Sequence, residues 1–273
     1  MTSSPHQKES EPVSIDASKE EVDMRGKNLT SIAFKNLDNA RIVKLNLNSN
    51  QLTSLPEKIG RLTGLKELDL DSNQLTSLPV EIGRLTGLKK LYLDNNQLSS
   101  LPVEIGNMTG LERLNLEDNQ LTSLPVEIGR LTGLEVLDLS NNQLTSLPVE
   151  IGRLTGLEQL RLSNNQLTSL PVEIGRLTGL KVLWLNNNQL TSLPVEIGML
   201  TGLWSLYLSN NPLTTPPMEV CEEGITAIRA YFLEHQTKAR PAKSAAKTMQ
   251  PVASEEAVNG GLPSHNEVVG SKV

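Results

Sequence analysis

Leu75-Thr-Ser-Leu-Pro-Val-Glu-Ile-Gly-Arg-Leu-Thr-Gly-Leu88 is a stretch that the chain repeats along most of its length. It recurs unchanged at residues 121–134, 144–157 and 167–180, and with a few substitutions at residues 52–65, 98–111 and 190–203. The unchanged copies that begin at residues 121, 144 and 167 are 23 residues apart. A fixed period of this length is typical of a solenoid, in which each repeat forms one coil that stacks on the next.

Each repeat combines a strand pattern with a pattern typical of a short helical turn. Residues 65–75 follow the motif L-x-x-L-x-L-x-x-N-x-L, and its Leu-x-Leu core alternates with polar residues, as in a strand with one buried face. Residues 78–85 read Leu-Pro-x-x-Ile-x-x-Leu, which places the apolar side chains on one side of a helical turn. Proline suits the first position of such a turn. We expect Gly83 and Gly87 to limit its length and to let the chain reverse.

The repeat register divides the chain into five parts. Residues 1–18 are polar and are expected to be disordered, and residues 19–41 form a degenerate N-terminal capping repeat. Eight full repeats of 23 residues occupy residues 42–223. Apolar residues at helical spacing predict a capping helix over residues 224–237, and residues 238–273 are expected to be a disordered tail.

Every full repeat carries an asparagine where the chain leaves the strand. A buried amide has both donors and an acceptor to satisfy, so we expect hydrogen bonds to backbone groups of its own and neighbouring coils. These bonds would form a ladder along the array. Its members are Asn50, Asn73, Asn96, Asn119, Asn142, Asn165, Asn188 and Asn211.

These units resemble leucine-rich repeats over residues 19–236. The Leu-Pro-x-x-Ile-x-x-Leu half is similar to the cytosolic subclass found in Ras-pathway scaffold proteins and in plant intracellular Ras-group-related proteins. The resemblance implies an α/β fold, a right-handed horseshoe with parallel strands on the concave face and short helical turns on the convex face. It also implies protein–protein interaction, commonly with small GTPases, kinases or phosphatases.

Composition and charge exclude several classes of function. Lys and Arg total 25 against 31 Asp and Glu, a net charge of −6, so no basic field favours nucleic acid. No apolar run approaches the roughly 18 residues that membrane insertion requires. Cys221 is the one cysteine, so no disulfide forms within the chain, and the N-terminal residues lack the apolar core of a signal peptide. We therefore expect a cytoplasmic protein.

Stacking places the variable strand positions in columns that line the concave face, and aromatic residues gather at one end of it. Trp184 and Tyr207 lie on adjacent coils after Arg161, and Trp204 lies beside them. Tryptophan and tyrosine are common anchors of interfaces, so these residues are candidates for partner binding. The alternative is that Trp204 packs under the C-terminal cap and Tyr207 only covers strand backbone. Tyr92 is four coils from Trp184 and belongs to another contact.

A second candidate is an acidic patch. Like charges stacked on adjacent strands are destabilising, so the patch is either a site for a basic partner or a solvated face of mixed charge. A calcium site lacks any supporting loop spacing. The patch comprises Asp69, Asp71, Asp94, Glu117 and Asp118. The basic residues that would compensate it on the same coils are Lys44, Lys66, Lys89, Lys90 and Arg113.

The sequence offers little for catalysis. His6, His235 and His265 lie outside the eight full repeats, and so no nucleophile–base pair or histidine and cysteine metal cluster is expected in the groove. No phosphate-binding glycine loop appears. We therefore expect no catalytic, cofactor-binding or metal-binding residues, and no cofactor.

Three hypotheses of function follow. The leading one is a non-catalytic scaffold that binds a protein partner in the concave groove, in intracellular signalling. The second is a repeat subunit of a larger regulatory assembly that recruits a GTPase, kinase, phosphatase or ubiquitin ligase through its tails. The third is an enzyme or a metal-binding protein. Residues 271–273, Ser-Lys-Val, also resemble a C-terminal PDZ-domain ligand and a peroxisomal address, which are weak matches.

Overall fold

The computed structural model describes residues 11–239 of the chain. Contacts divide the chain into two units, Met1–His235 and Gln236–Val273. The first unit holds the repeats and their caps. Of the second, the structure describes the last turn of helix α2, and residues 240–273 lie outside the described part.

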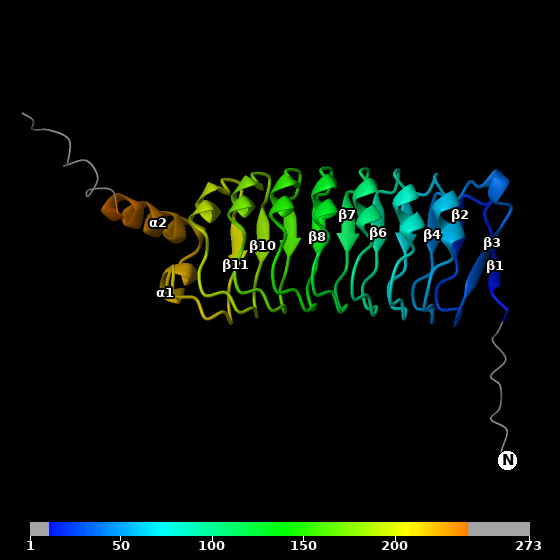
Figure 1. Cartoon of the computed structure of the whole chain (residues 1–273), viewed down its shortest axis with the longest axis horizontal. Helices are drawn as coiled ribbons and strands as arrows, with labels where there is room; N and C mark the ends of the chain where they lie inside the picture. The colour runs from blue at the N-terminus through cyan, green and yellow to red at the C-terminus, as the bar shows by residue number, and fades with distance from the viewer. Residues whose placement is uncertain (1–10, 240–273) are drawn as a thin grey trace, which may run out of the picture. The chain divides into compact units, whose positions relative to one another are not determined.

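The repeats form one parallel sheet, in which the strands follow one another in chain order (Figure 1). Each strand pairs in constant register with the strand one repeat later, as Leu45 with Leu68 and Leu68 with Leu91. Within the described residues the sheet has nine strands. They are β2 (Glu21–Asp23), β4 (Lys44–Asn46), β5 (Glu67–Asp69), β6 (Lys90–Tyr92), β7 (Arg113–Asn115), β8 (Val136–Asp138), β9 (Gln159–Arg161), β10 (Val182–Trp184) and β11 (Ser205–Tyr207).

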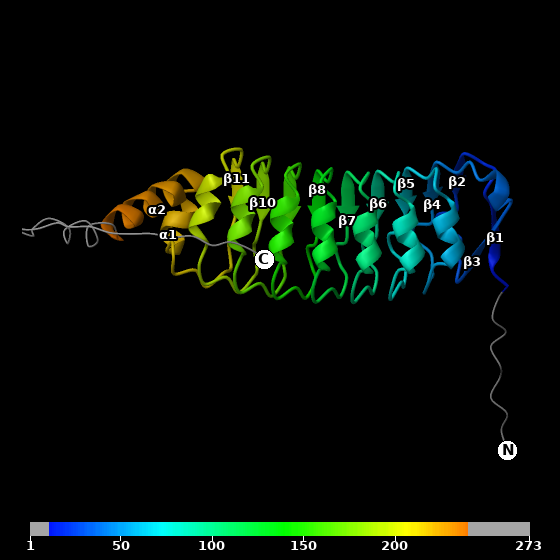
Figure 2. The ribbon, with the colours of Figure 1, turned by 45° about the horizontal axis from the view of Figure 1, so that its top comes forward.

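The Leu-Pro-x-x-Ile-x-x-Leu half of each of the first seven full repeats forms a 3-10 turn on the other side of the coil (Figures 1 and 2). In one such turn the N–H of Ile82 donates to the carbonyl of Pro79 at 3.0 Å, which is the i to i+3 bond of a 3-10 helix. The turns are η2 (Glu57–Arg61), η3 (Val80–Arg84), η4 (Val103–Asn107), η5 (Val126–Arg130), η6 (Val149–Arg153), η7 (Val172–Arg176) and η8 (Val195–Met199).

The glycine inside each of the turns η2 to η7 lies against the backbone of the next turn. A Cβ atom added at Gly83 would lie 2.5 Å from the carbonyl oxygen of Glu104 in the next turn. Real Cβ atoms essentially never come that close to backbone, so the glycine is required because adjacent turns touch. That the glycine also limits the length of the turn stays a prediction.

The core lies between the sheet and the turns. The central leucine of each interior strand is fully buried, as Leu68 and Leu114 show, and so is the isoleucine of each turn, as at Ile82. These side chains belong to one continuous hydrophobic core, so burial is shared along the stack. A single coil has no such partners, and this is the physical reason that the repeats occur as an array.

The N-terminal cap begins earlier than the sequence suggests. Val13–Asp16 form strand β1, which pairs in parallel with β3 (Ile32–Lys35), and the η1 turn (Leu37–Asn39) follows. The expected disorder of residues 1–18 is therefore wrong for this segment. Ile15 is buried and covers the end of the core. The sequence did not indicate this strand, because its alternation of apolar and polar residues is short and lies within a polar segment. Residues 1–10 lie outside the described part.

Two helices follow the last repeat. The first, α1 (Met218–Glu222), falls inside the range assigned to the eighth repeat, and α2 (Ile225–Ala239) replaces the expected helix at residues 224–237. Ile228 is fully buried against the core. Arg229 fixes α2 to the last turn by donating from Nε to the carbonyl of Gly198 at 3.2 Å.

Candidate functional site

The outward-facing residues of the sheet form two columns, which together we name the strand face. The inner column, taken from the strands themselves, reads Asn46, Asp69, Tyr92, Asn115, Asp138, Arg161, Trp184 and Tyr207. The outer column, two residues later in each repeat, reads Asn48, Asp71, Asp94, Glu117, Ser140, Ser163, Asn186 and Ser209. Strand pairing places successive members of the inner column on adjacent strands.

Three successive members of the inner column stack on one another. The guanidinium carbon of Arg161 lies 4.9 Å from the ring centroid of Trp184, within the range of a cation–π contact. The rings of Trp184 and Tyr207 are stacked, with centroids 5.8 Å apart and planes 10° apart. Arg161 is held from its other side by a salt bridge of 3.1 Å to Asp138, whose side chain is buried. The stack is thus ordered in advance of any contact with a partner.

The other two predicted aromatic residues lie apart from this stack. Trp204 precedes β11 and is 70% exposed, so it does not pack under the C-terminal cap, and that alternative is wrong. Tyr207 is 45% exposed, and its ring covers Trp184 as well as strand backbone. Tyr92 lies on β6, four strands before β10, and is half-buried.

The acidic residues Asp71, Asp94 and Glu117, which we name the acidic row, lie side by side in the outer column. The N–H of Asp94 donates to Oδ1 of Asp71 at 2.7 Å, and the N–H of Glu117 donates to Oδ1 of Asp94 at 3.1 Å. Burial, and next the charge of Asp69, raises the pKa of Asp71 to about 6. Burial, and next the charge of Asp71, raises the pKa of Asp94 to about 7.

Glu117 shares this behaviour, because burial and then the charge of Asp138 raise the pKa of its carboxyl. The lysines of the same coils pair elsewhere: Lys44 with Glu67 at 3.3 Å, and Lys89 with Glu112 at 2.7 Å. Across residues 11–239, no ion pair joins a basic side chain to the acidic row. Backbone N–H groups donate to the carboxylates of Asp71 and Asp94, and Nδ2 of Asn141 donates to Oε1 of Glu117 at 3.2 Å.

The remaining acidic candidates, Asp69 and Asp118, lie beside the acidic row. Asp69 accepts hydrogen bonds from the N–H of Asp71 at 3.1 Å and from Nδ2 of Asn48 at 3.4 Å. Asp118 is exposed, with a φ of 52°. Neither residue is part of the acidic row, although Asp69 contributes to its field.

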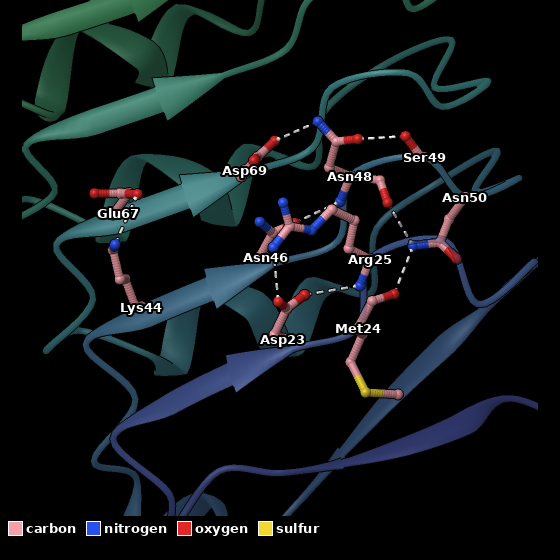
Figure 3. A network of polar contacts seen from close by, with 10 residues as sticks. All are labelled: Asp23, Met24, Arg25, Lys44, Asn46, Asn48, Ser49, Asn50, Glu67 and Asp69. Carbon is pink, nitrogen blue, oxygen red and sulfur yellow. Dashed lines mark hydrogen bonds and ion pairs between the residues drawn. The ribbon is translucent and has the colours of Figure 1, made fainter.

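The asparagine of each repeat points into the coil. Nδ2 of Asn50 donates to the carbonyls of Met24 at 3.0 Å and Leu47 at 2.8 Å, and Oδ1 accepts from the N–H of Leu29 at 3.0 Å. Figure 3 shows this amide beside the carbonyls of Met24 and Asn48. The same pattern of bonds recurs with the other seven asparagines. All eight side chains are buried.

Sequence reasoning missed a second row of amides at the rim of the strand face. Nδ2 of Asn164 donates to Oδ1 of Asn141 at 2.6 Å, and Asn187 and Asn210 continue the chain at the same distance. All four have positive φ, a conformation that asparagine tolerates better than most residues. The signal was present, because this position holds only Ser, Asn or Asp in the eight full repeats.

A hollow of about 370 Å³ lies on the first strands of the strand face, and Asp69 is the one predicted site residue that lines it. Side chains of both signs line it, among them Asp23, Arg25, Lys44 and Glu67 (Figure 3). Arg25 is bound to Asp23 at 2.9 Å and Lys44 to Glu67 at 3.3 Å. These charges therefore satisfy one another and do not mark a ligand of either sign.

In the part of the chain that the structure describes, no group of three or more His, Cys, Asp or Glu side chains is arranged to hold a metal ion. No helix among residues 11–239 combines the length and apolar character needed to cross a membrane.

Comparisons with known proteins identify the family. A model of the leucine-rich repeat region matches residues 22–123, and a leucine-rich repeat model matches residues 109–167 and 155–213. The chain therefore belongs to the leucine-rich repeat proteins, as its repeat pattern predicts. A fold of this kind is typical of non-enzymatic scaffolds that bind protein partners.

Two solved structures show the same kind of array. A leucine-rich repeat protein of Leptospira interrogans is 41% identical with a TM-score of 0.66, over 71% of this chain and 56% of that one. The leucine-rich repeat ectodomain of the plant membrane receptor kinase GASSHO1/SCHENGEN3 from Arabidopsis thaliana, in complex with CASPARIAN STRIP INTEGRITY FACTOR 2, is 37% identical with a TM-score of 0.54. That match covers 68% of this chain and 27% of the ectodomain. The search of curated proteins found no match.

Proposed function

We propose that the protein is a non-catalytic scaffold that holds a protein partner on its strand face, with Arg161, Trp184 and Tyr207 as the anchor. The observation that carries this proposal is their stack of a cation and two rings, fixed at its base by buried Asp138. Aromatic and arginine side chains supply most of the binding energy in many interfaces. A stack that is already ordered loses little conformational entropy when a partner binds.

The acidic row supports a partner with a basic patch. The carboxylates are partly buried and lack ion pairs within residues 11–239, so a cationic side chain would relieve their mutual repulsion. Glu117 and Trp184 are three strands apart, which is roughly 14 Å at a strand spacing near 4.8 Å. One folded partner spans that distance, with a basic region over the acidic row and an apolar region over the stack.

The proposed setting is the cytoplasm, in signalling through a small GTPase, a kinase or a phosphatase. Its support is the resemblance of the Leu-Pro-x-x-Ile-x-x-Leu half to cytosolic repeats, together with Cys221, which is buried and free. The similarity to a receptor ectodomain concerns the repeats alone and does not place this chain in a compartment. The first measurement is therefore the localisation of the tagged full chain in its native cell. Enrichment outside the cell would contradict this setting.

The Trp184→Ala, Tyr207→Ala double variant tests the anchor. Proximity labelling and pull-down from native cells, quantified against wild type, should lose the partner that wild type enriches. Tyr92→Ala removes an aromatic ring from the same column and should retain the partner, since it lies outside the stack. Retention of the partner by the double variant, with its fold intact, would contradict the proposal.

Recruitment through the tails is the competing hypothesis, and truncation separates it from groove binding. Because β1 begins at Val13, the deletions should remove residues 1–10 and 240–273 and keep residues 11–239. Partner binding retained by this truncated chain assigns the contact to the repeats and caps. Separately, a peptide of the last ten residues should be assayed on a panel of PDZ domains, and failure to bind ends that possibility.

A further inference from the structure

The last strand of the sheet differs from all the interior strands. β11 pairs with β10 on one side, and within the described residues no strand pairs with it on the other. The central leucines of β9 and β10, Leu160 and Leu183, are fully buried. Leu206, at the same place in β11, is only partly buried. The cap therefore leaves the outer side of the last strand incompletely covered.

The interior repeats show which backbone groups this edge offers. The N–H of Leu185 donates to the carbonyl of Tyr207 at 2.8 Å, and the N–H of Asn187 donates to the carbonyl of Ser209 at 2.9 Å. One repeat later the equivalent donors belong to Leu208 and Asn210, and among residues 11–239 no further strand accepts from them. An exposed row of strand N–H and C=O groups is a template for another extended chain.

A hollow of about 200 Å³ lies beside this edge, between β11 and α1. Leu206, Met218 and Cys221 give it apolar walls. Its volume is below the roughly 300–1,000 Å³ of most small-molecule sites, which fits one aliphatic side chain better than a whole ligand. Asn186 lines the same hollow, and its Oδ1 is buried without a hydrogen-bond partner. The hollow thus combines an apolar wall with an unsatisfied acceptor.

The charge around the hollow is negative. Glu222 lines it, and Glu219 and Glu223 lie on the same short cap segment. Burial raises the pKa of the Cys221 thiol, and the negative charges of Glu219 and Glu222 raise it further. A cationic residue in an incoming segment would complement this field.

We propose that β11 accepts an extended segment of a partner protein as an additional strand, with an aliphatic side chain in the hollow and a neighbouring Lys or Arg facing Glu222. Backbone pairing supplies the affinity and the hollow selects the side chain, as in other complexes formed by strand addition. A second copy of this chain is a poorer occupant, because it would bring its own acidic cap against this one. The contact goes beyond the strand-face proposal, because it adds backbone pairing along the edge of β11. Three residues of the strand face, Asn186, Tyr207 and Ser209, also line the hollow.

The test begins with selection of random linear peptides of about ten residues, displayed on phage, against the immobilised full chain. A Met218→Asp chain serves for counter-selection, because it places a charge in the apolar wall. We expect the recovered peptides to share an aliphatic residue next to Lys or Arg. A synthesised peptide should bind wild type, and Met218→Asp should weaken its Kd by roughly tenfold or more.

Two matched controls separate this site from the rest of the surface. Met199→Asp makes the same substitution at an exposed methionine at the end of η8, outside the hollow, and should bind like wild type. Trp184→Ala should also bind like wild type, which distinguishes strand addition from binding on the strand face. If thermal unfolding shows that Met218→Asp is unfolded, the Glu222→Lys variant takes its place in the assay. Glu222→Lys should also weaken the binding of the cationic peptide.

Backbone methylation of the peptide gives the sharpest readout. In a parallel pair, alternate residues direct their N–H groups toward the neighbouring strand, so N-methylation at one set of alternate positions should abolish binding and at the other should not. Equal tolerance at every position would overturn the proposal, as would a selection that yields no peptide sensitive to Met218→Asp or Glu222→Lys. A wild-type dimer that Met218→Asp dissociates would assign the edge to a second copy and also overturn it.

Discussion

The two sides of each coil contrast in how far their sequences vary. The turns from η3 to η7 read Val-Glu-Ile-Gly-Arg with one change, at Asn107, whereas the inner column of the strand face carries acids, amides, an arginine and three aromatic rings. At the turns a missing Cβ is what allows the next coil to approach, as at Gly83. On the strand face the side chains point away from the core. Repetition therefore marks where packing determines the residue, and variation marks where it does not.

This contrast is not absolute, because the strand face also has internal structure. Asp138 is buried and paired with Arg161, and the acidic row accepts backbone N–H groups from adjacent strands. Some variable residues thus stabilise one another. The predictions that follow measure how much stability each side contributes, from the largest expected effect to the smallest.

The largest loss of stability is expected at the asparagines that join the two sides. Asn142→Ala removes three bonds donated by Nδ2, including one of 2.9 Å to the carbonyl of Leu116, and one that Oδ1 accepts from the N–H of Leu121. Buried backbone groups would remain unsatisfied, so the free energy of unfolding should fall by about 3 kcal/mol. Urea unfolding measures it. Exposed Gln143→Ala is the control, and an unchanged midpoint for Asn142→Ala would refute the ladder.

A smaller loss is expected where adjacent turns touch. A Cβ at Gly129 would lie 2.6 Å from the carbonyl oxygen of Glu150, so Gly129→Ala forces the two coils apart and should cost about 1–2 kcal/mol. Gly133 lies in the same repeat, and a Cβ there would meet its nearest atom at 3.6 Å. Gly133→Ala should therefore be neutral or slightly stabilising. Equal urea midpoints for the two variants would show that the turns do not fix the spacing.

On the strand face, removal of one carboxylate should stabilise the protein at high pH. Because the pKa of Asp94 is raised to about 7, the native state keeps its proton up to a higher pH than the unfolded chain. The free energy of unfolding that this group contributes is therefore greatest below about pH 4 and is lost as the pH rises through 7. Asp94→Asn removes the loss of stability that accompanies ionisation of Asp94. The new amide can also donate to Oδ1 of Asn115, which within residues 11–239 is buried without a hydrogen-bond partner.

Urea midpoints of Asp94→Asn and wild type should therefore differ more at pH 8 than at pH 5, with the variant more stable at pH 8. Ser163→Ala, in the same outer column, removes no carboxyl and should follow the pH dependence of wild type. If the difference between Asp94→Asn and wild type is the same at both pH values, the acidic row does not titrate as described.

The array was predictable because its period repeats the same physical constraint many times. The parallel sheet and the apolar core follow from the alternation at Leu68 and Leu70 and from the spacing of Ile82. The ends were harder, since a single strand such as Val13–Asp16 provides no repeat to compare it with. Residues on the strand face could be assigned to columns from the register alone.

What the columns do depends on side-chain conformation, which the register does not determine. The sequence placed Arg161 next to Trp184, yet nothing in the spacing showed that the guanidinium would lie over the ring or that Asp138 would hold it. Of the lysines offered as partners for the acidic patch, Lys44 and Lys90 pair with Glu67, and Lys89 pairs with Glu112. The hollow beside β11 could not be predicted from the sequence either, because it depends on how α1 packs after the last repeat.

The smallest effect on stability is expected at the aromatic stack. Tyr207 is 45% exposed and Trp184 is partly buried, so their loss removes one stacked pair and little core burial. A pair of this kind is worth about 0.5–1.5 kcal/mol beyond the area it buries, and the Trp184→Ala, Tyr207→Ala variant should lose about 1 kcal/mol. Thermal and urea unfolding measure the change, with Tyr92→Ala as the control. A loss as large as that of Asn142→Ala would assign the rings to the fold, and the contrast between the two sides of the coil would then fail where the proposed binding depends on it.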